Sequence, residues 1–339
     1  MGHQSWKRVA ALALVAAAYY AAYAHAQVQA DAKAAAVMAD VRKALGGEQK
    51  IAGVKGLSLR ADYRRELSVP GGGGGSMTFV MMGGSGTTGG SQQATGKIEI
   101  DVDLPDKYLR TDIGSAGLAM TRTDGFEASR PFLEVVPNTP GMHVQVDNPA
   151  TDPARAKAAL RRSQSDLARL LLGLTGGTQP GFLVTYAYGG QAESPDGKAD
   201  IIDVTGPDDF NVRLFIDAET HLPLMLSYME PEPRVITRMM TPGGREGGRG
   251  GPSPAGATPK PELTQEQRDE IAKQMKEAEA TPPKLVEYRL FFSDYRRVDG
   301  VSLPHRIARG LGAKTTEEWD VTSYKVNPSF KADRFKVGS

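Results

Sequence analysis

The chain has 339 residues, of which 41 are basic and 40 acidic, so its formal net charge is +1. This balance argues against nucleic acid as a partner, because surfaces that bind nucleic acid carry an excess of Lys and Arg. The sequence contains no cysteine, which excludes disulfides, thiol catalysis, thiolate metal sites and a lipid-modified N-terminal cysteine.

Residues 1–26 are typical of a secretory signal peptide. Lys7 and Arg8 precede an apolar run over 9–24, and the stretch ends in AHA, which fits the small-x-small cleavage rule. About 16 apolar residues are few for a membrane span, so a cleaved leader is favoured over an uncleaved anchor. We predict a periplasmic mature chain, 27–339, with no transmembrane segment.

Two helices are predicted to lie on a sheet. The first, over 28–45, is amphipathic and ends at a Gly-Gly pair. The second, over 152–174, has Asp152 as N-cap and Pro153 at its first position. One side of the second helix carries leucines that would face the sheet, and its basic residues are expected to face water: Arg155, Lys157, Arg161, Arg162 and Arg169.

Alternating apolar and polar residues predict many short strands. Before the second helix these are 57–64, 77–82, 97–104, 108–113, 118–122 and 126–136. After it come 182–188, 199–204, 212–216, 224–229, 285–292, a strand entered through Pro304, and 316–326.

The last three strands form a predicted meander over 285–327, with a turn at Asp299-Gly300. Because proline has no N–H for a ladder, Pro304 is expected at a strand start or on an edge. A strand, a polar turn and a Leu-Pro pair also occur in this order over 210–229. The repeat indicates a sheet built by successive hairpins rather than a βαβ fold.

Two low-complexity stretches interrupt the pattern. Residues 70–96 are Gly-rich, and 230–283 contain a Pro/Gly-rich linker over 241–261 followed by a charged helix over 263–278. We interpret both as insertions within a single domain of roughly 220 ordered residues. The first contains GSGTTG and a later Gly-Lys pair, but a strand follows instead of the helix that a phosphate-binding loop requires.

An acidic row, Glu99, Asp101 and Asp103, alternates with apolar residues along one strand. Calcium sites need convergent oxygens, usually from a tight loop, whereas side chains along a strand diverge. A solvated face is therefore predicted for these carboxylates.

The sequence carries none of the usual signs of catalysis. The mature chain has three histidines, His143, His221 and His305, and they are not at metal-ligand spacing. His305 shares a strand face with Leu303 and Ile307, which favours a packed or edge histidine. We predict no metal, no cofactor and no enzymatic activity.

Four stretches together resemble a known family. They are ALGG at 44–47, FIDAETHLPLMLSY at 215–228, FFSDYRRVDGVSLPHRI at 291–307 and EEWDVTSYKVNPSF at 317–330. Together with the leader, the antiparallel strands and the Leu-rich helix, they resemble the outer-membrane lipoprotein carrier (LolA/LolB-like) superfamily. The resemblance is a pattern of hairpins spread over 31–337 outside the low-complexity stretches.

The resemblance implies an α+β, mainly β fold, in which a curved antiparallel sheet forms an unclosed half-barrel and helices cover its concave face. It also implies a carrier that holds lipids, acyl chains or lipoproteins in an apolar cavity without a covalent step. In such carriers an arginine of an early strand helps to hold the lid closed, and Arg60 or Arg64 is the nearest candidate. The predicted ligand-binding residues are Leu171, Leu226, Tyr228, Leu290 and Phe292.

The two insertions depart from the family pattern, and they keep a second hypothesis open. In this alternative the chain is an envelope interaction or sensor module whose insertions bind a protein partner, since long loops often carry function. A third possibility is a hydrolase that uses the half-barrel as a platform.

Overall fold

The computed structural model describes residues 31–67, 92–116, 120–138, 152–195, 197–231, 284–312 and 314–336. Several predicted features lie outside the described residues. They are the leader 1–26, the strand at 77–82, the linker 241–261, the helix at 263–278 and His143.

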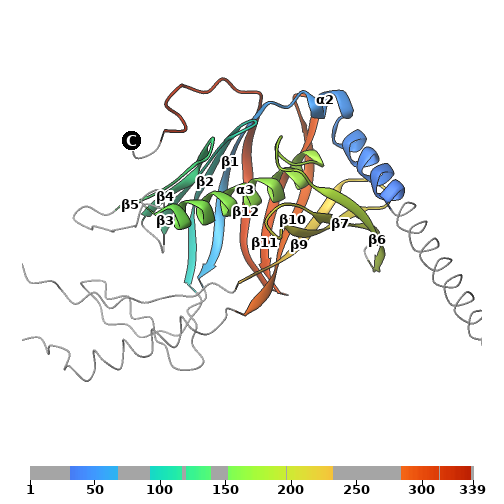
Figure 1. The fold of residues 1–339 in the computed structure, drawn as a ribbon. Coiled ribbons are helices and arrows are strands. Elements are labelled where there is room, and N and C mark those ends of the chain that lie inside the picture. Colours follow the sequence, from blue (N-terminus) through green and yellow to red (C-terminus); the bar gives the residue numbers. More distant parts are fainter. Residues whose placement is uncertain are drawn as a thin grey trace, which may run out of the picture.

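The described strands form one open, curved antiparallel sheet of 12 strands (Figure 1). Two runs of successive hairpins, β1 to β5 and β6 to β12, join where β1 pairs with β12, so β5 and β6 are the edges. The predicted fold class is confirmed. The strands are β1 Gly56–Leu67, β2 Gln92–Asp103, β3 Lys107–Ala116, β4 Met120–Glu127, β5 Arg130–Pro137, β6 Thr185–Ser194, β7 Gly197–Thr205, β8 Asn211–Asp217, β9 Pro223–Pro231, β10 Leu285–Val298, β11 Val301–Leu311 and β12 Lys314–Val326.

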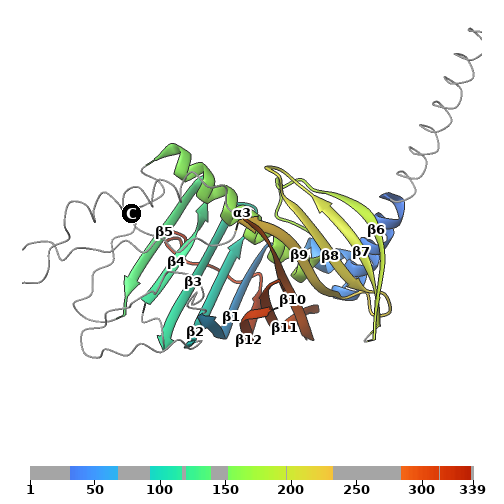
Figure 2. The ribbon, with the colours of Figure 1, turned by 90° about the horizontal axis from the view of Figure 1, so that it is seen from below.

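Helices lie on the concave face of the sheet (Figures 1 and 2). The long helix α3, Pro153–Thr175, crosses this face and packs against β4, β5, β9 and β11. A helix over 31–45 lies beside β6, where Lys33 Nζ is 3.7 Å from the centre of the Tyr188 ring. A short helix, α2 (Glu48–Ala52), follows it.

The start of α3 confirms the predicted cap. The Asp152 carboxylate accepts hydrogen bonds from the backbone N–H groups of Ala154 and Arg155, at 2.8 and 3.3 Å. Pro153 occupies the first turn, where its missing N–H costs no helical bond. The helix ends at Gly176, whose φ of 65° is the left-handed conformation that glycine adopts without strain.

The core lies between the helices and the concave face. Leu57, Leu59 and Ala61 of β1 alternate inward, and each is at most 3% exposed. They belong to one cluster with the buried residues of both long helices, such as Met38 and Leu172. The alternation of each strand therefore decides which side chains meet the helices.

The boundary between β4 and β5 differs from the prediction. The sequence suggested a break between strands at 118–122 and 126–136, but the turn lies at Ala128, which has φ 55°. Gly125 lies within β4, where a Cβ atom would be 2.0 Å from the Tyr108 carbonyl oxygen. This glycine permits close approach of two backbones rather than a turn.

Pro304 does not lie on an edge, because β11 pairs with β10 on one side and β12 on the other. It is tolerated because the ladder between β11 and β12 begins only at Arg306, which pairs with Asp320. On that side the missing N–H therefore removes no ladder hydrogen bond. Its carbonyl oxygen accepts a hydrogen bond from the Tyr324 hydroxyl at 2.7 Å.

The acidic row of β2 is not uniformly solvated as predicted. Asp101 is fully buried, and its carboxylate accepts hydrogen bonds from Ser58 at 2.7 Å, Arg60 at 2.8 and 3.0 Å, and Arg334 at 2.6 Å. Burial alone would raise the pKa of this carboxyl, but these hydrogen bonds lower it below its usual value. The prediction failed because Arg334 comes from the distant C-terminal segment, which local alternation does not reveal.

The described strands on either side of both predicted insertions are hydrogen-bonded neighbours. β1 pairs with β2 across 68–91, and β9 pairs with β10 across 232–283. Among the helices that the structure describes, none is long and apolar enough to span a bilayer.

Candidate functional site

The candidate site begins with a row of cross-strand neighbours on the concave face. Arg65 of β1 pairs with Glu317 of β12, and Glu317 pairs on its other side with Arg309 of β11. The row then becomes apolar, because the next partners are Leu290 of β10 and Leu226 of β9. Arg309 therefore lies at the border between a charged and an apolar part of one surface.

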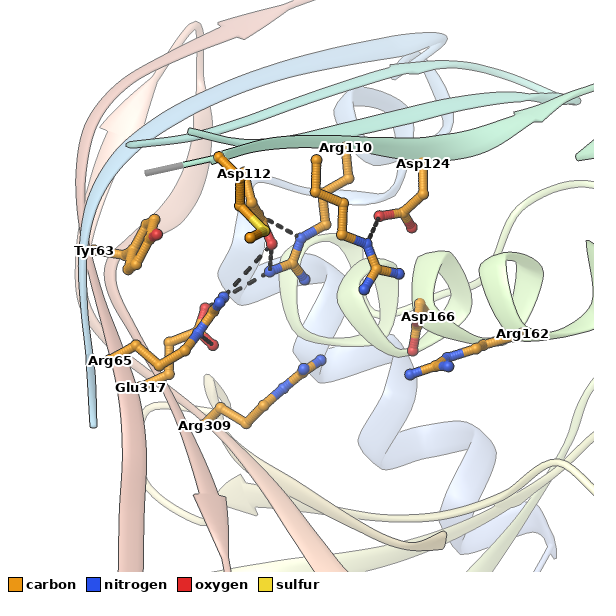
Figure 3. Close-up of a pocket in the computed structure, with 11 residues that line it drawn as sticks. Tyr63, Arg65, Arg110, Asp112, Asp124, Arg162, Asp166, Arg309 and Glu317 are labelled. Carbon is orange, nitrogen blue, oxygen red and sulfur yellow. Dashed lines mark hydrogen bonds and ion pairs between the residues drawn. The ribbon is translucent and has the colours of Figure 1, made fainter. Parts of the chain in front are cut away.

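A pocket of about 370 Å³ lies between this charged part and the N-terminal half of α3 (Figure 3). Its walls carry five arginines and four carboxylates, together with one tyrosine and one methionine. The lining residues are Tyr63, Arg65, Arg110, Asp112, Met120, Arg122, Asp124, Arg162, Asp166, Arg309 and Glu317.

Glu317 is the most buried carboxylate of the pocket, with 5% of its surface exposed. Arg65 Nε donates to its Oε2 atom at 2.9 Å, and the Trp319 indole N–H donates to Oε1. Burial alone would raise the pKa of Glu317, but the charges of Arg110, Arg65 and Arg309 outweigh it and lower this pKa to about 2. Glu317 is therefore ionised at neutral pH and acts as an acceptor, not as a proton donor.

The other carboxylates on the sheet are also paired. Arg110 Nε donates to Asp112 Oδ1 at 2.9 Å, and its guanidinium lies 3.6 Å from Glu317. On β4, Arg122 Nε donates to Asp124 Oδ1 at 3.0 Å. These pairs balance charge within the sheet, because each carboxylate has at least one arginine beside it.

Arg169 corrects the prediction that the basic residues of α3 face water. Only 7% of Arg169 is exposed, and its Nη1 lies 3.1 Å from Asp166 and 2.6 Å from Glu230 of β9. Its guanidinium also lies 3.8 Å from the centre of the Tyr228 ring. The prediction failed because the last turns of α3 are covered on all sides, and Glu230 and Asp166 compensate the buried charge.

Two arginines of the pocket have no such partner. Among the described residues, neither Arg309 nor Arg162 has a hydrogen bond or ion pair through its guanidinium. Arg309 Nε is buried, whereas Arg162 is exposed on α3. Burial alone would lower the pKa of the Arg309 guanidinium, but nearby acidic groups, Glu317 among them, outweigh it and raise this pKa, so Arg309 stays charged.

A small apolar cleft of about 20 Å³ continues from the pocket beneath α3. It shares Arg110, Asp166 and Arg309 with the charged pocket. The rest of its lining is mostly apolar and consists of Ile100, Tyr108, Arg169, Leu170, Tyr228, Leu290 and Trp319.

The five predicted ligand-binding residues all belong to the core: Leu171 lies on α3 itself, and the other four lie on β9 and β10. Their exposed fractions are 2% for Leu171, 0% for Leu226, 5% for Tyr228, 6% for Leu290 and 2% for Phe292. Tyr228 and Leu290 line the apolar cleft. Phe292 packs directly against α3, since a Cβ atom at Gly173 would lie 2.0 Å from its ring. Their role in binding remains a prediction.

Arg60 and Arg64 point to the face opposite α3. Arg60 binds Asp101, and Arg64 Nη2 lies 3.1 Å from Asp320. Neither of these contacts involves α3, and a lid-holding role for Arg60 or Arg64 remains a prediction. The arginine of β1 on the helix side is Arg65, and extending the alternation of 57–64 by one residue would have found it, since Tyr63 also faces the pocket.

Within the described ranges, no three His, Asp or Glu side chains gather as a metal site requires. His305 packs edge-on against Tyr324 with ring centres 5.4 Å apart, and its Nδ1 is 3.1 Å from the Leu303 carbonyl oxygen. This is the packed position predicted for it.

Comparison with known proteins gives structural matches alone. No family model and no curated protein matches the sequence. A LolA superfamily protein from Nitrosomonas europaea is similar in structure, with TM-score 0.43 and 8% identity over 90% of this chain and 97% of that one. A DUF1329 family protein from Desulfovibrio piger has TM-score 0.41 and 8% identity over 89% and 97% of the two chains. A putative outer membrane lipoprotein-sorting protein domain from Vibrio parahaemolyticus has TM-score 0.38 and 7% identity over 85% and 94%.

Proposed function

We propose that this chain is a non-catalytic periplasmic carrier that binds an amphiphilic ligand, a lipid, an acyl chain or a lipoprotein, between the sheet and α3. One observation carries the proposal. The charged pocket and the apolar cleft beneath α3 adjoin, since Arg110, Asp166 and Arg309 line both. A polar space that leads into an apolar one is complementary to a molecule with a polar head and an apolar tail.

Binding of an acyl chain requires α3 to move. The cleft of about 20 Å³ has room for about one water molecule and not for a hydrocarbon chain. If the C-terminal half of α3 lifts, Leu290 and Tyr228 become accessible to the ligand. An acyl chain then replaces the helix leucines on this surface, at about 0.8 kcal/mol for each buried CH₂.

The first test is native mass spectrometry of the mature protein purified from the cells that make it, followed by identification of any bound molecule. We expect a lipid or an acylated peptide in near-stoichiometric amount. An empty protein that also fails to take up a fluorescent fatty acid contradicts the proposal. The mass of the mature chain also tests cleavage after Ala26, which would leave Gln27 at the N-terminus.

The second test is Leu290→Glu, which puts a charge into the apolar cleft. We expect it to abolish fatty-acid uptake, because the new carboxylate lies beside Arg309, repels an anionic head group and puts a charge where the alkyl chain would lie. The matched control is Leu285→Glu in the same strand, since Leu285 is 58% exposed and should tolerate the change. Circular dichroism first establishes that both variants are folded. Unchanged uptake by a folded Leu290→Glu variant removes this residue from the site.

A further inference from the structure

We propose that Arg309 and Arg162 form a receptor for one anionic group, a phosphate or a carboxylate, at the head of the ligand. The inference rests on the proposed function, to which it adds the chemistry of the ligand head group. It starts from the two arginines that have no partner among the described residues.

The surroundings of Arg309 explain why it needs an external acceptor. Its cross-strand neighbour Glu317 accepts hydrogen bonds from Arg65 and Trp319, and no hydrogen bond or ion pair joins it to Arg309 in the described part of the chain. The other cross-strand neighbour, Leu290, has no polar atom in its side chain. Arg309 Nε is thus a buried donor without an acceptor, which is rare in a folded protein unless a ligand or water supplies one.

Arg162 approaches the same space from the opposite wall. It lies on α3 one turn before Asp166, and in Figure 3 its guanidinium and that of Arg309 both point into the pocket. Asp166 does not neutralise either of them by a direct contact, because its carboxylate is bonded to Arg169 at 3.1 Å. The two free guanidinium groups therefore face one cavity from the sheet and from the helix.

The carboxylates of the pocket do not prevent anion binding. Glu317 and Asp112 are held by Arg65 and Arg110, and Asp124 by Arg122. After these pairs are formed, the uncommitted charge in the pocket is positive. Guanidinium groups bind carboxylate and phosphate through parallel N–H···O bonds, which favours these two groups over a halide or a neutral polar head.

The position of Arg309 gives the ligand a direction. The residue lines both the charged pocket and the apolar cleft, and its neighbour Leu290 lies on the apolar side. An anion bound to Arg309 therefore has its attached chain directed beneath α3. Because Arg162 belongs to α3 and Arg309 to the sheet, the same anion would also hold the helix against β11.

The test is isothermal titration of the full mature chain with three probes. Dodecyl phosphate and dodecyl maltoside, both below their critical micelle concentrations, share an alkyl chain and differ in head-group charge, and inorganic phosphate has no chain. We expect dodecyl phosphate to bind at least about tenfold more tightly than dodecyl maltoside. We expect Arg309→Gln to remove most of this preference, because it removes the buried donor and its charge.

Arg122→Gln is the matched control. It removes the same charge from the same pocket, but Arg122 is bonded to Asp124 and is exposed on β4. We expect its affinity for dodecyl phosphate to fall by less than about threefold, since a bidentate contact and not net charge decides binding. The melting temperatures of Arg309→Gln and Arg122→Gln establish that both variants are folded before their affinities are compared.

The outcomes separate this inference from the proposed function. Equal affinity for dodecyl phosphate and dodecyl maltoside, or an unchanged preference in Arg309→Gln, overturns the anion receptor and leaves the carrier in place. Inorganic phosphate that binds as tightly as dodecyl phosphate, and depends on Arg309, supports the receptor but overturns the amphiphilic ligand. Failure of all three probes to bind overturns both.

Discussion

The two halves of α3 meet the same sheet in opposite ways. Residues 167–174 of the C-terminal half are buried without exception, and the backbone at Gly173 touches the ring of Phe292. In the N-terminal half, Arg162 and Asp166 stand over a pocket of about 370 Å³. One helix thus covers an apolar core with its C-terminal half and lines a charged pocket with its N-terminal half.

The difference shows how close packing and open space can share a single face. Beneath the C-terminal half, cross-strand partners such as Leu290 and Leu226 are apolar, so the helix gains stability by contact. Beneath the N-terminal half, Glu317 and its arginines hold one another by ion pairs, which do not need a helix on top of them. The N-terminal half is therefore the part of α3 that a ligand can approach.

The largest effect on stability is expected in the sheet beneath the N-terminal half of α3, when Glu317 of β12 loses its charge. The folded-state pKa of about 2 lies below the usual 4.5, so the ionised form stabilises the folded protein above pH 4.5. This contribution, on the order of 3 kcal/mol, is lost as the pH falls from 4.5 toward 2. Urea unfolding between pH 7 and pH 2 measures it.

The variant Glu317→Gln separates the contribution of Glu317 to stability from that of the other carboxylates. At pH 7 the variant should be less stable by about 3 kcal/mol, because Arg65 and Arg110 lose their shared counter-charge. The gap between wild type and variant should close as the pH approaches 2. A gap that stays constant over this range contradicts the assignment of the low pKa to Glu317.

The next largest effect on stability is expected in the C-terminal half of α3, where the helix packs against β10. Gly173→Ala places a Cβ atom 2.0 Å from the ring of Phe292, which forces the helix and β10 apart. Alanine favours the helix by about 1 kcal/mol, but overpacking costs about 3 kcal/mol, so a net loss near 2 kcal/mol is expected. Gly177→Ala is the control, since no atom lies within 4 Å of its Cβ position. Equal stability of the two variants would show that α3 does not press on Phe292.

Local patterns in the sequence predicted the sheet but not its charged pocket. Period-two alternation gives the face of each side chain, so the hairpin plan and the buried Leu290 followed from the sequence. Alternation does not reveal what covers a face, which is why Asp101 was expected in water although Arg334 reaches it from the distant C-terminal segment.

The pocket also depends on contacts between distant parts of the chain. Arg65 and Glu317 are 252 positions apart, and only the pairing of β1 with β12 brings them together. Such pairs leave no local signal, because each residue alone is a charged side chain on a strand. Arg169 was placed in water for the same reason, since its partner Glu230 lies in β9.

The smallest effect tests whether the two halves of α3 differ in stability. Asp152→Ala removes the side-chain cap that satisfies two backbone N–H groups at the start of the helix. We expect a global loss of about 1 kcal/mol at most. Hydrogen exchange should respond more strongly and locally, because residues 153–166 open without breaking the apolar contacts of 167–174.

Faster exchange confined to 153–166, with 167–174 unchanged, supports independent opening of the part of α3 that covers the charged pocket. Equal acceleration along the whole helix would mean that α3 opens as one unit, so that the charged pocket and the apolar core become accessible together.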